Sequence, residues 1–163
     1  MDLNLHSYPR QRLPDWAAAA TAGFAAGAVV MVLELLWSTL ASDRGPWGVS
    51  HMVAAIVMGP AVAQSNDYSL VVVAVALAAH YVLGVVFGVI LALILAPFIR
   101  DSSVGMVSLA GAVFGALLYL LNFHGMTLFF PWFVDWRGTQ ALVIHLIFGL
   151  TVALLYWKLN RQN

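Results

Sequence analysis

The sequence predicts an all-α integral membrane protein, a polytopic bundle of four transmembrane helices, and three observations lead to this prediction. Hydrophobic residues make up 63% of the 163 residues and charged residues only 9%, which is far from the composition of soluble domains. The charged residues lie outside four apolar runs or at their ends, and Glu34 is the exception inside a run. Each run supplies the roughly 20 helical residues that cross a bilayer. We therefore treat residues 1–163 as a single membrane domain.

The four apolar runs cover residues 16–40, 69–97, 104–128 and 139–158. The first run is too long for the apolar segment of a signal peptide, so we expect it to be a retained helix. Residues 47–62 form a shorter apolar stretch that is broken by Gly59 and Pro60. A stretch of this length does not cross a bilayer comfortably. We expect it to be interfacial or re-entrant within the first outer loop.

The distribution of lysine and arginine predicts the orientation. One side of the predicted membrane carries five basic residues and the other side carries two. The larger group is Arg10, Arg12, Arg100, Lys158 and Arg161, and the smaller group is Arg44 and Arg137. The positive-inside rule then predicts that the N- and C-termini are cytoplasmic.

Net charge and cysteine content exclude several classes of function. The formal net charge is zero, so the sequence has no basic footprint for nucleic acid, and the lipid bilayer is the partner that the composition predicts. Cysteine is absent, which excludes disulfide frameworks, thiolate metal sites and covalently attached c-type haem. Enzymatic nucleophile triads are not expected either, because the serines and threonines in the runs have no base and orienting group at a defined spacing.

The first and third runs align with each other, and so do the second and fourth. Three aligned pairs come from the first and third runs: Gly23 with Gly111, Gly27 with Gly115, and Glu34 with Asn122. Three more come from the second and fourth: His80 with His145, Gly84 with Gly149, and Gly88 with Ala153. This pattern predicts two parallel two-helix repeats. The alternatives are chance and a shared need for small residues at helix contacts.

The polar residues of these runs lie on the same helix faces as the glycines. Glu34, His80, Asn122 and His145 are therefore expected to meet inside the bundle. Seven glycines are expected to let the helices approach closely: Gly23, Gly27, Gly84, Gly88, Gly111, Gly115 and Gly149. Splaying of the helices beyond these contacts would leave a polar chamber toward the periplasm. His124 is expected at its edge, and His51 above it on the 47–62 segment, together with Met52 and Met58.

Three functions fit such a chamber. In the first, His80 and His145 bind haem b or a Cu, Zn or Fe ion, with Glu34 as a further ligand or as the group that orients a histidine. The protein would then be an electron-transfer or accessory subunit of a respiratory complex. In the second, the four polar residues form a buried hydrogen-bond network in a scaffold protein. In the third, Glu34 and the histidines carry a small ion or protons.

The segments Asn122-Phe123-His124, Phe130-Pro131-Trp132-Phe133 and His145-Leu-Ile-Phe-Gly149 follow one another along the chain. With this combination the sequence resembles a group of short four-helix proteobacterial inner-membrane proteins without an assigned activity. The resemblance covers most of the chain. It implies the membrane class and the inner-membrane location, but no activity and no functional residue. A protein of this size is also expected to form a homodimer or to join a larger membrane complex.

Overall fold

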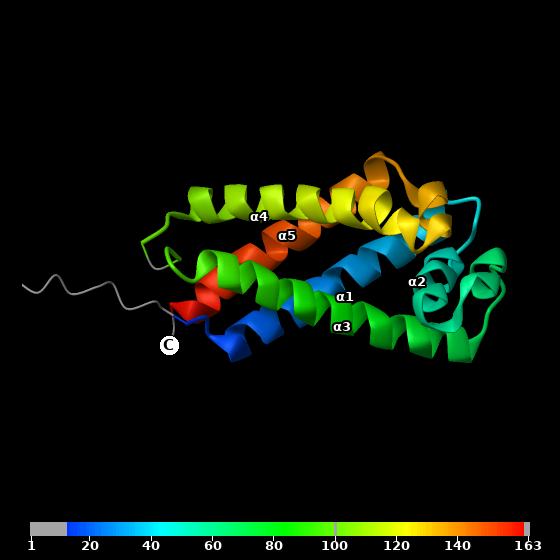
Figure 1. Ribbon diagram of the computed structural model, residues 1–163, viewed down its shortest axis with the longest axis horizontal. Coiled ribbons are helices and arrows are strands. Elements are labelled where there is room, and N and C mark those ends of the chain that lie inside the picture. The colour runs from blue at the N-terminus through cyan, green and yellow to red at the C-terminus, as the bar shows by residue number, and fades with distance from the viewer. Residues whose placement is uncertain (1–12, 100, 162–163) are drawn as a thin grey trace, which may run out of the picture.

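The computed structural model describes residues 13–99 and 101–161, and within these residues the fold is entirely helical (Figure 1). Four helices are long and apolar enough to cross a membrane. They are α1 (Trp16–Ala41), α3 (Leu70–Leu95), α4 (Val104–Leu120) with its irregular continuation to Leu128, and α5 (Thr139–Asn160). The predicted all-α class and the predicted number of membrane-length helices are confirmed.

Local sequence explains where these helices begin and end. The Asp15 carboxylate accepts a hydrogen bond from the Ala18 amide at 2.9 Å, and the hydroxyls of Ser69 and Ser103 cap α3 and α4 in the same way. Such caps satisfy amide groups that have no partner within the first helical turn. Helix α3 ends at Leu95, two residues before the predicted boundary at Pro97, since proline has no amide hydrogen with which to continue the helical pattern.

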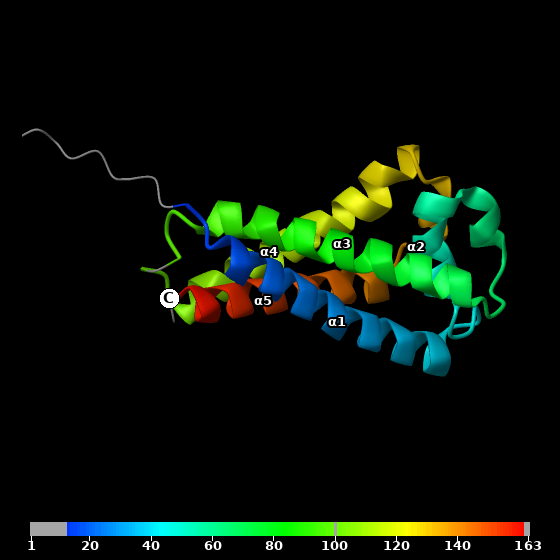
Figure 2. The same cartoon turned by 90° about the horizontal axis from the view of Figure 1, so that it is seen from below.

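Short helices gather at one end of the bundle (Figure 1): α2 (Gly48–Met58), η1 (Pro60–Gln64), η3 (Met126–Leu128) and η4 (Pro131–Trp136). Helix α1 begins and α5 ends at the opposite end (Figures 1 and 2). The segment predicted as interfacial or re-entrant thus consists of α2 and η1. Its 11-residue helix α2 is about half the length that a bilayer-spanning helix needs.

The four long helices pack unequally. Helix α1 packs against both α3 and α5, and α4 packs against α5. Helices α3 and α4 follow one another in the chain but make at most marginal contact, and α3 meets its diagonal neighbour α5 only briefly. The bundle is therefore closed on the α1–α5 side and loosely joined between α3 and α4.

Close glycine contacts hold each helix pair together. A Cβ atom at Gly88 would lie 2.8 Å from the carbonyl oxygen of Ala19, and one at Gly111 would lie 2.6 Å from the carbonyl oxygen of Gly149. Gly23 likewise meets the backbone of Gly84. Helix faces without side chains let the backbones approach and gain van der Waals contact, which is the main attraction between helices in lipid.

The contacts in the two helix pairs involve aligned positions. Gly23 of α1 contacts Gly84 and Gly88 of α3, while the aligned Gly111 of α4 contacts Gly149 and Ala153 of α5. The two pairs are not related by symmetry throughout, since α1 packs on α5 whereas α4 barely meets α3. The unequal contact between the pairs leaves room beside α3.

Candidate functional site

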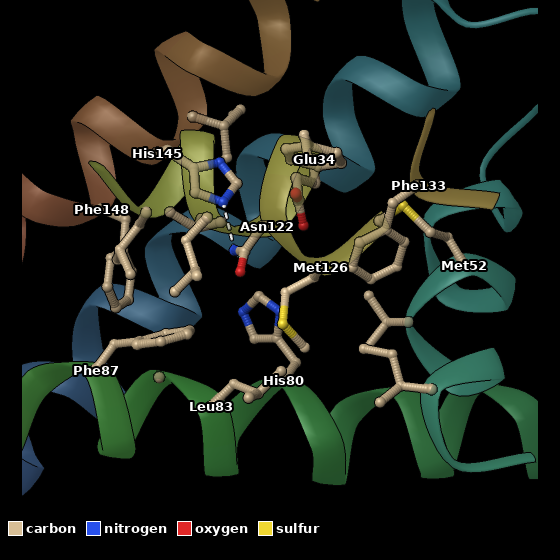
Figure 3. A pocket seen from close by; sticks show the side chains of 18 of the residues that line it. Glu34, Met52, His80, Leu83, Phe87, Asn122, Met126, Phe133, His145 and Phe148 are labelled. Carbon is tan, nitrogen blue, oxygen red and sulfur yellow. Dashed lines mark hydrogen bonds between the residues drawn. The ribbon is translucent and has the colours of Figure 1, made fainter. Parts of the chain in front are cut away.

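A cavity of about 420 Å³ lies in the half of the bundle that carries α2 and η4, and we call it the central cavity (Figure 3). Glu34 of α1, His80 of α3, Asn122 of the segment after α4 and His145 of α5 all contribute to its wall. The rest of the wall is almost entirely apolar, and its largest residues are Met52, Ile56, Leu83, Phe87, Leu118, Leu121, Phe123, Met126, Phe130, Phe133, Ile144 and Phe148. A volume of this size is typical of small-molecule sites.

His145 is held in one orientation by two hydrogen bonds. Its Nδ1 lies 2.8 Å from the carbonyl oxygen of Ala141, one turn earlier in α5. A carbonyl only accepts, so Nδ1 carries the proton and donates it. Nε2 is then free to accept, and the Asn122 side-chain nitrogen donates to it at 3.0 Å. The arrangement joins the segment after α4 to α5 and turns Asn122 toward the cavity (Figure 3).

His80 connects α3 to α1. Its Nε2 donates to the carbonyl oxygen of Gly27 at 2.9 Å, using the lone pair that the helical hydrogen bond leaves free. A Cβ at Gly27 would stand 3.6 Å from Nε2, which is an ordinary van der Waals distance, so this hydrogen bond does not itself require glycine. The ring of His80 borders the central cavity, and its Nδ1 is left available to a ligand.

Glu34 lies two turns beyond Gly27 on α1, and its carboxyl group points into the central cavity (Figure 3). Within the described part of the chain this carboxyl group has neither a hydrogen bond nor an ion pair. Glu34 and His80 also line a second cavity of about 200 Å³ between α1, α2 and α3. The two residues therefore stand between the two cavities.

A π-helical turn, η2 (Leu121–Gly125), places Asn122 in the cavity wall. Its wider spiral is marked by the Met126 amide, which donates to the carbonyl oxygen of Leu121. The carbonyl of Phe123 accepts a hydrogen bond from Nε of Arg137. Such turns are rare and are frequent at functional sites. The sequence predicted neither the turn nor the hydrogen bond from Arg137 to Phe123. The one sequence signal for an irregular turn was the presence of polar residues and a glycine between Asn122 and Gly125, near the end of an apolar run.

Of the three residues expected above the chamber on the 47–62 segment, His51, Met52 and Met58, only Met52 lines the central cavity. His51 is buried, and its Nδ1 and Nε2 lie 2.8 Å from the carbonyl oxygens of Val62 and Asp67. The ring therefore fastens α2 to the segment after it and does not line the central cavity. Met52 does line the cavity, whereas Met58 is exposed and lies outside its wall.

His124 was expected at the edge of the chamber, and its position differs from this expectation. Its side chain is exposed and stands edge-on to the ring of Tyr119 at 5.6 Å, outside the wall of the central cavity. The physical reason is the π-helical turn, which changes the angular step between residues and turns His124 away while Asn122 stays inside.

Residues 13–99 and 101–161 contain no cluster of three or more His, Asp or Glu side chains that could hold a metal ion. Glu34, His80 and His145 border one cavity. However, Nε2 of His80 and both ring nitrogens of His145 are engaged with neighbours in the chain. Binding of a metal ion or haem at these residues stays a prediction.

Comparisons with known proteins do not assign this chain to a family. Searches against protein-family models, curated proteins and solved structures returned no significant match. The resemblance to short four-helix proteobacterial membrane proteins therefore stays a prediction, and function has to be inferred from the central cavity.

Proposed function

We propose that this chain is an integral membrane protein that binds an amphiphilic small molecule in the central cavity. One observation carries the proposal: an apolar cavity with a group of polar side chains lies beside α3 and α4, two helices that hardly touch. In a membrane, the loosely joined side of the bundle faces lipid. A molecule dissolved in the bilayer then reaches the cavity laterally, without crossing water.

The lining suggests how such a molecule is held. The phenylalanine, leucine and isoleucine side chains accommodate an aliphatic or aromatic body. Glu34, the free Nδ1 of His80 and the side-chain amide of Asn122 offer partners to a polar end. Small-molecule sites generally combine a mostly apolar wall with a few polar groups that fix orientation.

Filling the cavity with a side chain tests this function. Leu83 lines the cavity on α3, whereas the neighbouring Val82 is 62% exposed and is not part of the wall. We expect Leu83→Trp to weaken binding of the uncharged fluorescent amphiphile N-phenyl-1-naphthylamine roughly tenfold, since a reduction of about 1.4 kcal/mol in binding free energy suffices. The matched variant Val82→Trp should bind like the wild type. Binding is measured by fluorescence titration in lipid nanodiscs, with empty nanodiscs subtracted.

Equal binding by the wild type and both variants would place the fluorescent amphiphile in the lipid or on the outer surface of the helices. That result would contradict the proposal.

A metal ion or haem b is the second candidate, and the hydrogen bonding of His145 favours it. Donation of Nδ1–H to a backbone carbonyl is the arrangement usual for ligating histidines, and Nε2 would bind the metal in place of its hydrogen bond from Asn122. Haem needs only two axial ligands from the protein, and His80 on α3 would be the other. In this form the chain would serve electron transfer or support a respiratory complex. Elemental analysis for iron, copper and zinc, beside the double variant His80→Ala/His145→Ala, separates this candidate from the first.

A scaffold role is the third candidate. The hydrogen bond from His80 to Gly27 links α3 to α1, and the one from Asn122 to His145 links the segment after α4 to α5. Polar links of this kind contribute roughly 1 kcal/mol each in membrane bundles. They support the fold under any of the three functions.

We also propose the inner-membrane topology with cytoplasmic termini and the parallel two-helix repeat. The topology is supported by Lys158 and Arg161 at the end of α5, with Arg44 and Arg137 at the opposite end of the bundle. Three of the basic residues behind the prediction, Arg10, Arg12 and Arg100, fall outside the described residues. The repeat is supported by the glycine contacts at aligned positions in the two helix pairs.

A further inference from the structure

We propose that the occupant of the central cavity is a lipophilic cation and that Glu34 is its counter-ion. This inference rests on the proposed function, because it assigns a chemical class to the amphiphile. The occupant would have an aromatic or aliphatic body and a positive charge at or near the position that the Glu34 carboxyl group faces.

No basic side chain of the described residues neutralises Glu34. The wall of the central cavity contains no lysine or arginine. Arg44 is stacked over the Trp136 ring at 4.8 Å, and Arg137 donates to the carbonyl of Phe123 and to the hydroxyl of Thr127. Charged groups inside a membrane are costly unless they are paired. A cationic ligand would supply the partner that the described chain lacks.

The polar neighbours of Glu34 are directed elsewhere. Nε2–H of His80 donates a hydrogen bond to the carbonyl oxygen of Gly27, and Nδ1–H of His145 donates one to the carbonyl oxygen of Ala141. The Asn122 amide nitrogen donates to His145. Among the described residues, none of these groups donates to the Glu34 carboxyl group. Among the polar side chains that line the central cavity, Glu34 is thus the one without a hydrogen-bond partner in the described residues.

The aromatic wall favours a cation as well. Five phenylalanines line the cavity: Phe87, Phe123, Phe130, Phe133 and Phe148. Ring faces attract cations electrostatically, and the attraction grows when the cation is desolvated. Glu34 would repel an anion, and a neutral amphiphile would give its carboxylate no charge partner. Charge and aromatic content therefore favour the same class of ligand.

The Glu34 carboxyl group is also accessible from a second direction. The second cavity reaches Glu34 and His80 from the side of the α1–α2 connection, where Pro46, Trp47 and Ser50 form its wall. A positive group beside Glu34 would therefore lie next to both cavities.

The experiment compares two ions of the same shape and opposite charge. Binding of tetraphenylphosphonium and tetraphenylborate is measured by equilibrium dialysis with the full chain in lipid nanodiscs, and binding to empty nanodiscs is subtracted. We expect the phosphonium to bind and the borate not to bind. Glu34→Gln should weaken phosphonium binding roughly thirtyfold or more, which corresponds to about 2 kcal/mol for losing one partner of a buried charge pair.

Asp101→Asn is the matched control. It makes the same carboxyl-to-amide change at an exposed residue in the α3–α4 loop, at the opposite end of the bundle, so it reports any effect of net charge alone. We expect its phosphonium affinity to equal that of the wild type. A comparable loss in both variants, or no loss in Glu34→Gln, overturns the counter-ion role.

The neutral amphiphile N-phenyl-1-naphthylamine separates failure of this inference from failure of the proposed function. If it binds in a manner that Leu83→Trp weakens while tetraphenylphosphonium does not bind, the cavity is a ligand site for another class and the cation proposal is wrong. If neither compound binds, the proposed function fails as well.

Discussion

Replacement of Gly149 by leucine is expected to destabilise the bundle by about 3 kcal/mol or more, the upper range for overpacking. A Cβ atom at this position would overlap the carbonyl oxygen of Gly111 and lie 2.7 Å from the amide nitrogen of Gly115. Both atoms belong to the backbone of α4, so no side-chain rotation can make room. The helices α4 and α5 would have to separate along their closest contact.

The destabilisation is measured by titrating the purified protein in mixed micelles with sodium dodecyl sulfate and following tryptophan fluorescence. Gly105→Leu is the matched control, because a Cβ at Gly105 would meet only the Ser103 hydroxyl at 3.9 Å. That variant should unfold like the wild type. Equal unfolding curves for the two leucine variants would show that the close α4–α5 contact does not carry the stability assigned to it.

Replacement of Tyr156 by alanine is expected to have the second largest effect. Tyr156 is the largest of the fully buried side chains and packs in the main core of the described residues. Its removal would leave a cavity among helices that cannot collapse fully, because their backbones are already held by the glycine contacts. Truncation of a buried aromatic residue costs about 3–5 kcal/mol in soluble proteins. We expect the lower part of this range here, because no hydrophobic driving force adds to the packing of helices in lipid.

Tyr156→Phe is the control for shape. It keeps the ring and changes only the hydroxyl group, so we expect a change of no more than about 1 kcal/mol in the same titration. The packing explanation would be contradicted if the alanine variant unfolded at the same detergent fraction as the phenylalanine variant.

The four helices could be predicted closely from the sequence because membrane chemistry leaves few choices. In lipid every backbone amide and carbonyl must find a partner within the segment, so a long apolar run has to be helical. The helices α1 and α5 end within two residues of the predicted boundaries. The shared faces of glycines and polar residues also predicted that Glu34, His80, Asn122 and His145 would line one space, as they do.

Sequence periodicity could not predict how the two helix pairs sit against each other. It identifies the face that a helix buries, but not which neighbour covers it, so the loose contact between α3 and α4 had no visible signal. The hydrogen-bond partners of the histidines could not be predicted from the sequence for a related reason. His80 donates to a backbone carbonyl of another helix, and any residue can offer a carbonyl. The π-helical turn at Asn122 depends on tertiary contacts such as the one from Arg137.

Binding of a membrane-derived ligand in the central cavity is tested most directly by mapping where a membrane-dissolved molecule contacts the chain. A benzophenone-bearing long-chain alcohol is photo-crosslinked to the protein in lipid bilayers, and the modified residues are identified by mass spectrometry. We predict crosslinks concentrated at Leu83, Phe87 and Met126 in the cavity wall, and their disappearance in Leu83→Trp. Crosslinks spread evenly over exposed apolar residues such as Leu93 and Leu109, with none in the cavity wall, would contradict a ligand site inside the bundle.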